Sequence, residues 1–121
     1  MPVGISEIAI DCTDPLVVAR FWCAALDYQV IEAEAGLISI ARSEPRAGEP
    51  VLCFAKVPES KTTKNRLHID VRPIASTQQE EVERLVGLGA NYADVGQSEN
   101  DDWVVLRDPE GNEFCVLSGT M

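Results

Sequence analysis

The chain has 121 residues, of which 20 are Asp or Glu and 10 are Lys or Arg, so its formal net charge is −10. This length suits a single domain over residues 1–121, and the acidic balance argues against nucleic acid and anionic membranes as partners. No apolar run approaches the ~20 residues of a membrane span, and Met1 to Gly4 are not typical of a basic, cleavable leader.

The cysteines are widely spaced, and no two of them form a Cys-x-x-Cys pair. Three of the four stand inside apolar runs; the set is Cys12, Cys23, Cys53 and Cys115. This pattern is typical of buried free thiols in a reducing compartment rather than of disulfides or a zinc site. The sequence therefore predicts a soluble, cytoplasmic protein.

Regular structure is predicted from the first residues onward. Residues 5–11 alternate, which predicts a half-buried strand with Ile8 and Ile10 on one face. Residues 13–15, Thr-Asp-Pro, indicate a helix start, with a capping side chain before a proline at the first helical position. The helix carries one broad apolar stripe, formed by Val17, Val18, Phe21, Trp22, Ala25 and Leu26.

Three further strands complete the first half. Residues 28–33 and 37–41 are short apolar runs on either side of Gly36, which indicates a hairpin. After a polar loop, residues 51–57 predict a fourth strand.

The second half begins with a strand over residues 66–72. Two overlapping capping boxes then indicate a helix start, Ser76 with Gln79 and Thr77 with Glu80. Val82, Leu85 and Val86 are expected on its buried face, Glu80 is expected to pair with Arg84, and Gly87 or Gly89 ends the helix.

Three more strands are predicted over residues 91–95, 103–107 and 113–117. The last two are joined by residues 108–112, Asp-Pro-Glu-Gly-Asn, where we expect Gly111 to take the positive φ of a tight turn.

The order β-α-β-β-β thus occurs twice, about sixty residues apart, which is an internal repeat. The modules span residues 5–57 and 66–118, and residues 58–65 join them. The fold class is α+β: two tandem βαβββ modules forming a cupped, partly open mixed sheet with one helix behind each module. We expect function in the cup, on the strand faces that the helices leave uncovered.

The joint between the modules is basic, with Lys61, Lys64 and Arg66, and it leads into the only histidine. On a strand, His68 and Asp70 share one face, which they present to a cavity or to water. The opposite, apolar face is formed by Leu67, Ile69 and Val71. The basic run is interpreted first as a solvated loop, and alternatively as a holder for an anionic group. Asn65 is expected to fix the loop by bonding its own backbone.

Several of these stretches also resemble a known family. They are the helix residues Asp14, Pro15, Phe21, Trp22, Ala25 and Leu26, the joint VPESKTTKNRLHID over residues 57–70, residues 88–90, and DPEGNEFC over residues 108–115. They resemble the glyoxalase / bleomycin-resistance / dioxygenase superfamily (vicinal oxygen chelate fold), in particular its small glyoxalase-like branch. The resemblance covers nearly the whole chain.

The resemblance implies a divalent metal held by the first and last strand of each module. The four positions fall on Glu7, Ala55, His68 and Cys115, and Ala55 cannot coordinate a metal. Cys115 replaces a carboxylate, although its thiolate suits zinc, and Cys53 is an alternative to Ala55 if the register shifts. The set favours no resident metal; a divalent ion bound by Glu7, His68 and Cys115 is the alternative.

Two classes of function stay open, a metal-free binder of a small organic molecule and a metal-dependent lyase, isomerase or dioxygenase. An interaction module has no positive signal. The candidate ligand-binding residues are His68, Asp70, Trp103, Cys115 and Glu7. Trp103 suits an aromatic wall at the rim of the cup, and the simplest interpretation of Cys115 is a small buried hydrophobe. The resemblance also implies a homodimer.

Overall fold

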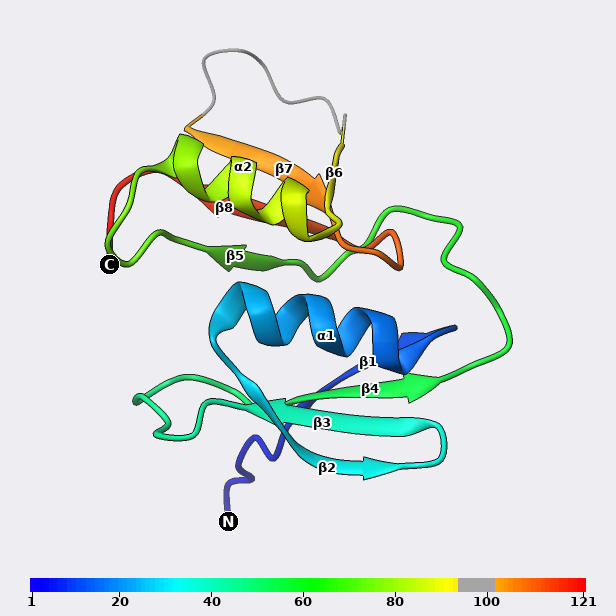
Figure 1. The fold of residues 1–121 in the computed structure, drawn as a ribbon. Coiled ribbons are helices and arrows are strands. Elements are labelled where there is room, and N and C mark those ends of the chain that lie inside the picture. Colours follow the sequence, from blue (N-terminus) through cyan, green and yellow to red (C-terminus); the bar gives the residue numbers. More distant parts are fainter. Residues whose placement is uncertain (94–101) are drawn as a thin grey trace. The chain divides into compact units, whose positions relative to one another are not determined.

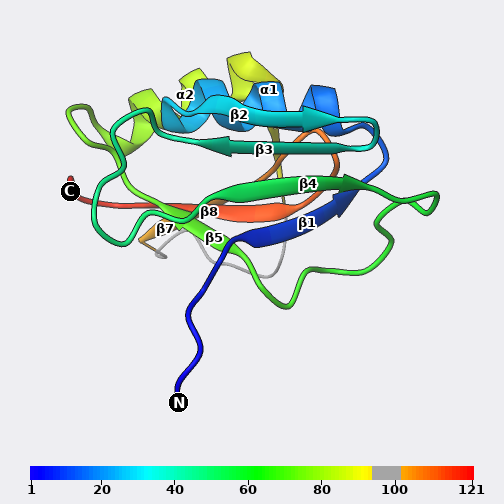
Figure 2. The same ribbon diagram turned by 90° about the horizontal axis from the view of Figure 1, so that it is seen from below.

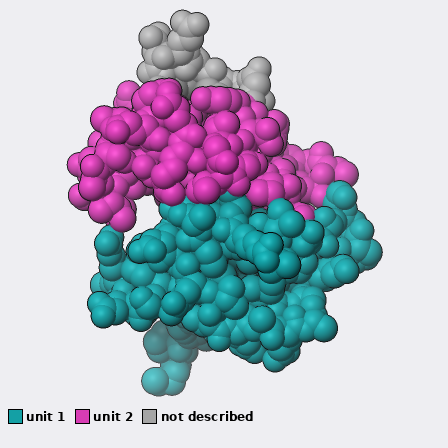
Figure 3. All heavy atoms as spheres, in the orientation of Figure 1, with its two compact units in different colours: residues 1–60 teal, residues 61–121 magenta. Residues whose placement is uncertain are grey.

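The computed structural model describes residues 1–93 and 102–121, and the chain divides into two compact units, residues 1–60 and 61–121 (Figure 3). The first unit contains β1 (Ile8–Cys12), α1 (Pro15–Leu26), β2 (Gln29–Glu34), β3 (Leu37–Ala41) and β4 (Leu52–Lys56). The second contains β5 (Ile69–Val71), α2 (Gln78–Leu88), β6 (Asn91–Tyr92), β7 (Trp103–Arg107) and β8 (Glu113–Leu117). The predicted repeat of βαβββ is confirmed (Figure 1).

Each unit builds its own four-stranded sheet with the same topology. The strand orders are β1-β4-β3-β2 and β5-β8-β7-β6. In each sheet the first strand of the unit pairs in parallel with the last, and the other pairs are antiparallel (Figure 2). The α+β fold of two tandem modules follows directly from this pattern.

Helix α1 begins and ends where its sequence predicts. The Asp14 side chain caps the first turn by accepting a hydrogen bond from the Val17 N–H, Pro15 opens the helix, and Asp27 ends it at a φ of 58°. The helix packs on β3 and β4. The apolar stripe is narrower than predicted, because Val17 is 47% exposed while Val18 is fully buried.

Helix α2 uses one of its two predicted capping boxes. The Thr77 hydroxyl accepts from the Glu80 N–H, and the Glu80 carboxylate accepts from the Thr77 N–H. Because Glu80 turns back to the cap, Arg84 pairs with Glu81 instead of with the predicted Glu80. Gly89 ends the helix. Val82 and Leu85 are buried as predicted, whereas Val86 is only half-buried.

Several strands are shorter than predicted, and the first strand of each unit begins later than predicted. The first begins at Ile8, where the backbone N–H bonds to Val51, and Ile5 lies exposed before it. The strand expected over residues 66–72 is reduced to β5, because only Ile69–Val71 pair with β8. Leu67 therefore lies outside the strand and is exposed rather than on an apolar face. Part of the strand expected over residues 91–95, residues 94 and 95, lies outside the described residues.

The turn between β7 and β8 is built by one buried carboxylate. Asp108 accepts hydrogen bonds from the Glu110 and Asn112 N–H groups, at 2.9 and 3.0 Å. Gly111 has a φ of +89°, as predicted. A Cβ built on Gly111 would meet nothing within 4 Å, so only the backbone conformation disfavours a side chain there.

We expect Gly111→Ala to lower the free energy of unfolding by about 1 kcal/mol, because the Cβ of alanine is disfavoured sterically at a positive φ. The matched control is Gly87→Ala, which lies inside α2, is also free of contacts within 4 Å and has no positive φ. That change should stabilise by about 0.5–1 kcal/mol through helix propensity. Urea unfolding of both variants measures the difference, and equal effects would show that the turn does not constrain residue 111.

Candidate functional site

One face of the second sheet carries most of the polar side chains predicted for the site. Side chains alternate along β8, so Glu113, Cys115 and Leu117 lie on the face opposite to Phe114 and Val116. Strand pairing places matching residues of β7 beside them on that face, Arg107 beside Glu113, Val105 beside Cys115 and Trp103 beside Leu117. We call this surface the site face.

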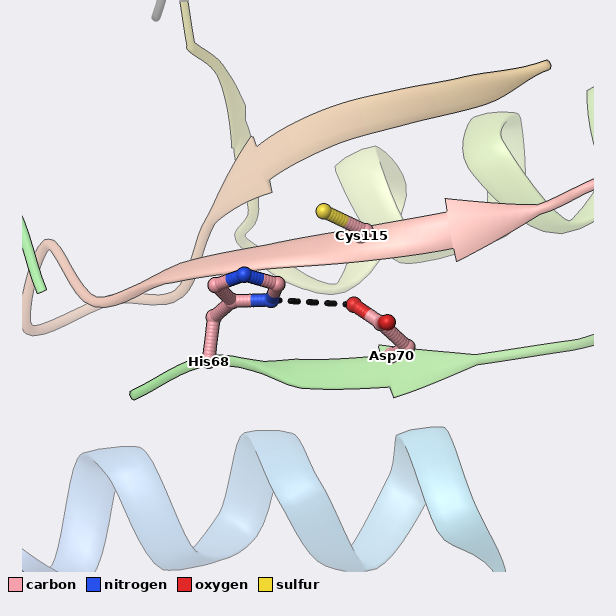
Figure 4. Close-up of side chains that lie close together, drawn as sticks. All are labelled: His68, Asp70 and Cys115. Carbon is pink, nitrogen blue, oxygen red and sulfur yellow. Dashed lines mark hydrogen bonds and ion pairs between the residues drawn. The ribbon is translucent and has the colours of Figure 1, made fainter. Parts of the chain in front are cut away.

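Three predicted residues meet at the centre of the site face (Figure 4). His68 Nδ1 lies 3.0 Å from Asp70 Oδ1, and the parallel register of β5 and β8 sets Asp70 directly beside Cys115. One ligand atom from each of the three residues lies within 4.8 Å of the others. His68 lies just before β5 and Asp70 lies within it.

The cluster keeps the Cys115 thiol protonated at neutral pH. Burial and the neighbouring Asp70 carboxylate raise the pKa of Cys115 to about 11, and Lys64 opposes them. Asp70 itself accepts a hydrogen bond from His68 at 3.0 Å. Because the thiolate is the reactive form of cysteine, Cys115 is a poor nucleophile in this setting.

We expect Asp70→Asn to speed alkylation of Cys115 by iodoacetamide several-fold at pH 8, because the change removes a negative charge that raises the thiol pKa. Mass spectrometry of the modified peptides measures the rate. Cys23 is an internal control, since burial alone raises its pKa. A rate at Cys115 that stays unchanged, or that rises together with that of Cys23, would contradict the role given to Asp70.

The other two candidate residues, Trp103 and Glu7, do not belong to the cluster of His68, Asp70 and Cys115. Trp103 begins β7 on the site face and is 41% exposed, two positions along the strand from Val105. Glu7 belongs to the first unit, just before β1, where its carboxylate accepts from the Ser6 hydroxyl. The three possible metal ligands that lie together in the described part of the chain are His68, Asp70 and Cys115. The resemblance had implied Glu7 in place of Asp70.

Two further positions considered for a metal ligand, Cys53 and Ala55, lie in the first unit, and the pairing of β4 with β1 places them. Cys53 and Ala55 lie on β4 beside Ala9 and Asp11 of β1, so they share one face of that sheet. All four cysteines of the chain lie in its described part, and all are free thiols. Neither of the two described helices has the length and apolar character of a membrane span.

The sequence did not predict a buried carboxylate at the start of β8. Glu113 is 6% exposed and accepts from Lys61 Nζ at 2.7 Å and from the Asn65 N–H at 2.8 Å. The Asn65 side chain donates to Asn112 Oδ1, whereas we expected it to bond its own backbone. The basic run is therefore tied to the last hairpin, and Lys61 is no solvated side chain. The signal in the sequence was Glu113 itself, because a carboxylate in an otherwise apolar strand is buried only with a cation beside it.

The comparisons with known proteins agree with this architecture. Two tandem βαβββ units, each closed by a parallel pair of its first and last strands, place the chain in the class of vicinal-oxygen-chelate proteins. The glyoxalase-like domain family matches residues 7–117, so the chain belongs to that family. A search of curated proteins finds no match.

Solved structures share the fold at low sequence identity. FosX, a fosfomycin resistance protein from Mesorhizobium loti, has a TM-score of 0.73 and 15% identity, covering 100% of this chain and 95% of its own. A mutant of FosX from Listeria monocytogenes was solved in complex with Mn(II) and 1S,2S-dihydroxypropylphosphonic acid. It has a TM-score of 0.73 and 16% sequence identity, and the match covers 100% of this chain and 94% of that chain. A glyoxalase/bleomycin resistance protein/dioxygenase family enzyme from Burkholderia phytofirmans PsJN has a TM-score of 0.69 and 18% sequence identity. This match covers 92% of this chain and 94% of that chain. At these identities the likeness concerns the fold alone.

The class implies a divalent metal, and the donor chemistry of the cluster tests whether one fits. One imidazole, one carboxylate and one thiol within 4.8 Å meet the count of an open zinc site. They suit a soft ion better than Mn²⁺ or Mg²⁺, which prefer oxygen ligands. A metal would have to displace the thiol proton and compete for the Asp70 oxygen that His68 already holds.

Proposed function

We propose that this glyoxalase-like protein binds a small organic molecule on the site face, without a resident divalent metal. One observation carries the proposal: the Asp70 carboxylate already accepts a hydrogen bond from His68 at 3.0 Å, and the third possible metal ligand, Cys115, keeps its thiol proton. A carboxylate that already has a donor, beside a protonated thiol, has less need of a cation than three deprotonated ligands would.

The site face offers the two kinds of contact that such a ligand needs. His68 and Asp70 are 42% and 45% exposed, so a polar group of the ligand can reach them. Nδ1 of His68 is engaged with Asp70, which leaves Nε2 as the ring nitrogen to meet the ligand. Trp103 and Leu117 lie side by side and supply apolar area.

A second candidate is a metal-dependent lyase, isomerase or dioxygenase. The observation that favours it is the set of three possible metal-ligand atoms, which lie within 4.8 Å of one another. His68, Asp70 and Cys115 would hold the ion, and the bound ion would polarise oxygen atoms of a substrate. The FosX mutant from Listeria, which has the same fold, was crystallised with Mn(II) and a phosphonic acid.

Metal analysis separates the two candidates. We expect protein purified without a metal-binding tag to contain far less than one equivalent of metal, and Zn²⁺, Mn²⁺, Ni²⁺ or Fe²⁺ to leave its melting temperature unchanged. A metal bound at 100 times its Kd would add about 2.7 kcal/mol, which is several degrees for this size. One equivalent of metal that is lost in His68→Ala but kept in Cys23→Ser would establish the enzyme candidate instead.

A second measurement tests ligand binding directly. Benzamide and benzoate, titrated to about 10 mM to reach fragment affinities, should shift the NMR signals of the Trp103 indole and the Cys115 amide. The Trp22 indole, buried in the first unit, is the internal control. If neither compound moves the Trp103 and Cys115 signals, the site face is not a binding surface for such molecules.

We further propose a cytoplasmic setting and a homodimer. Four free thiols suit a reducing compartment, and the charge of −10 disfavours nucleic acid and anionic membranes as partners. Sedimentation at several concentrations tests the dimer, for which a constant monomer mass would be the contrary result.

A further inference from the structure

A pocket of about 430 Å³ opens beside the start of β8. Its lining consists of residues 61–64, Arg107, Gly111 and Glu113, all from the second unit. Three of these residues are cationic and one is acidic, an excess of two positive charges in a chain with a net charge of −10. A positive pocket in an acidic protein attracts anions selectively, because the surrounding surface repels them.

The buried carboxylate does not cancel this field, because it already has its own partners. Lys61 and the Asn65 N–H both donate to Glu113 at hydrogen-bond distance. Burial tends to raise the pKa of Glu113, but these hydrogen bonds lower it below its usual value, so the group stays ionised. Lys61 is thereby neutralised, and the charge left for a ligand comes from Lys64 and from Arg107, whose Nε lies 3.7 Å from Glu113.

The pocket also offers hydrogen-bond donors suited to an oxyanion. Thr62 and Thr63, which lie between the two lysines in sequence, line the pocket and carry hydroxyl groups. The Arg107 guanidinium is a planar fork that can bind two oxygens of one carboxylate or phosphate. Gly111 of the turn also lines the pocket and contributes no side chain to its volume.

The pocket continues the site face at one end. Glu113 and Arg107 are paired neighbours that lie two positions from Cys115 and Val105 on the same face. The positive charge of Lys64 is close enough to Cys115 to lower the pKa of its thiol. Trp103 and Leu117 lie at the other end, four residues or about 13 Å from the charged end. The charged end and the aromatic end thus belong to one face of the sheet.

We propose that the pocket binds an oxyanion, the carboxylate or phosphate group of the ligand whose apolar part extends along the site face toward Trp103. The inference rests on the proposed function and narrows it to anionic organic molecules. The shared chemistry of both groups is a compact negative charge with several acceptor oxygens, which Arg107 and Lys64 recognise.

Four probes test the inference in NMR titrations that follow the amides of residues 62–64 and the Trp103 indole. Benzoate and benzamide have the same shape and differ in charge, phenyl phosphate carries the alternative anion, and inorganic phosphate lacks an apolar part. We expect benzoate or phenyl phosphate to shift the amides of residues 62–64 and to bind about tenfold more tightly than benzamide. Inorganic phosphate should shift only the amides of the pocket.

Two variants each remove one pocket charge. Arg107→Gln and Lys64→Gln should each weaken binding of the anionic probe about fivefold or more and leave benzamide unchanged. Arg46→Gln is the matched control, because Arg46 is exposed in the first unit, outside the pocket. If Arg107→Gln fails to fold, Lys64→Gln, which changes an exposed loop residue, still provides the test.

The outcomes separate this inference from the proposed function. Equal binding of benzoate, phenyl phosphate and benzamide at Trp103 would overturn the anion pocket and keep the organic ligand. Shifts of the pocket amides by inorganic phosphate, with no probe reaching Trp103, would support the pocket and overturn the proposed function. The absence of any anion-dependent shift at residues 62–64 would overturn the inference.

Discussion

Replacing Trp22 with alanine should lower the free energy of unfolding by about 3–5 kcal/mol, because it empties a large volume inside a packed core. Trp22 is 1% exposed on the inner side of α1, and its ring meets the edge of Phe21 with centroids 5.2 Å apart. The surrounding residues cannot close over a cavity of that size without moving α1 from β3 and β4. Chemical denaturation of both proteins measures the loss.

The chain contains its own control for this prediction. Trp103 is the second of only two tryptophans, and it is 41% exposed at the start of a strand. Trp103→Ala should therefore cost less than about 1 kcal/mol. A loss below about 1 kcal/mol for Trp22→Ala as well would show that α1 does not pack against the sheet through this side chain.

Glu113→Gln is expected to have the second largest effect, a loss of about 2–3 kcal/mol at pH 7. The substitution preserves the shape of the side chain but removes the charge that holds the Lys61 ammonium at 2.7 Å. It also weakens the acceptor for the Asn65 N–H. An amide in this place leaves a largely buried cation without a counter-charge, which is the costly part of breaking such a pair.

The effect should depend on pH with a definite sign. The folded pKa of Glu113 lies below its usual 4.5, so its contribution is present above pH 4.5 and is lost as pH falls through the folded pKa. The stability difference between the native protein and Glu113→Gln should therefore shrink as the solution is acidified below pH 4.5. Glu59→Gln, an exposed position in the same loop region, should change stability by less than about 0.5 kcal/mol. A difference that stays constant down to pH 2 would contradict the ion pair.

Local chemistry explains why most elements could be predicted from the sequence. The Asp14 cap, the Thr77–Glu80 capping box and the positive φ of Gly111 each depend on residues within four positions of one another. The repeat of βαβββ followed from patterns of the same short range. The membership in the glyoxalase-like family rested on such motifs taken together.

Apart from the local Glu80–Arg84 pair, the main errors concern contacts between residues distant in the chain. The strand at residues 66–72 was predicted too long because the hydrophobic alternation says nothing of where pairing with β8 begins. Lys61 and Asn65 bond to Glu113, which lies some fifty residues later in the chain. No local pattern reports such a partner.

The candidate site was predicted in part for the same reason. His68 and Asp70 were recognised as a pair from their spacing, and Cys115 from the resemblance. Their meeting within 4.8 Å depends on the parallel register of β5 with β8, which only the structure gives. The pocket at the charged end depends on the fold of residues 61–65 over Glu113, and the sequence left that run undecided between a solvated loop and an anion holder.

The parallel pair that closes each sheet also has a consequence for synthesis on the ribosome. Ile8 pairs with Leu52, 44 residues later, and Ile69 pairs with Phe114, 45 residues later. Contacts over such distances are slow to form, because a long loop must close before they stabilise anything. Neither sheet can be completed until its last strand has left the exit tunnel, so β1 and β5 stay exposed to wrong partners while the rest of their unit is translated. The twofold βαβββ order divides this exposure into two short intervals.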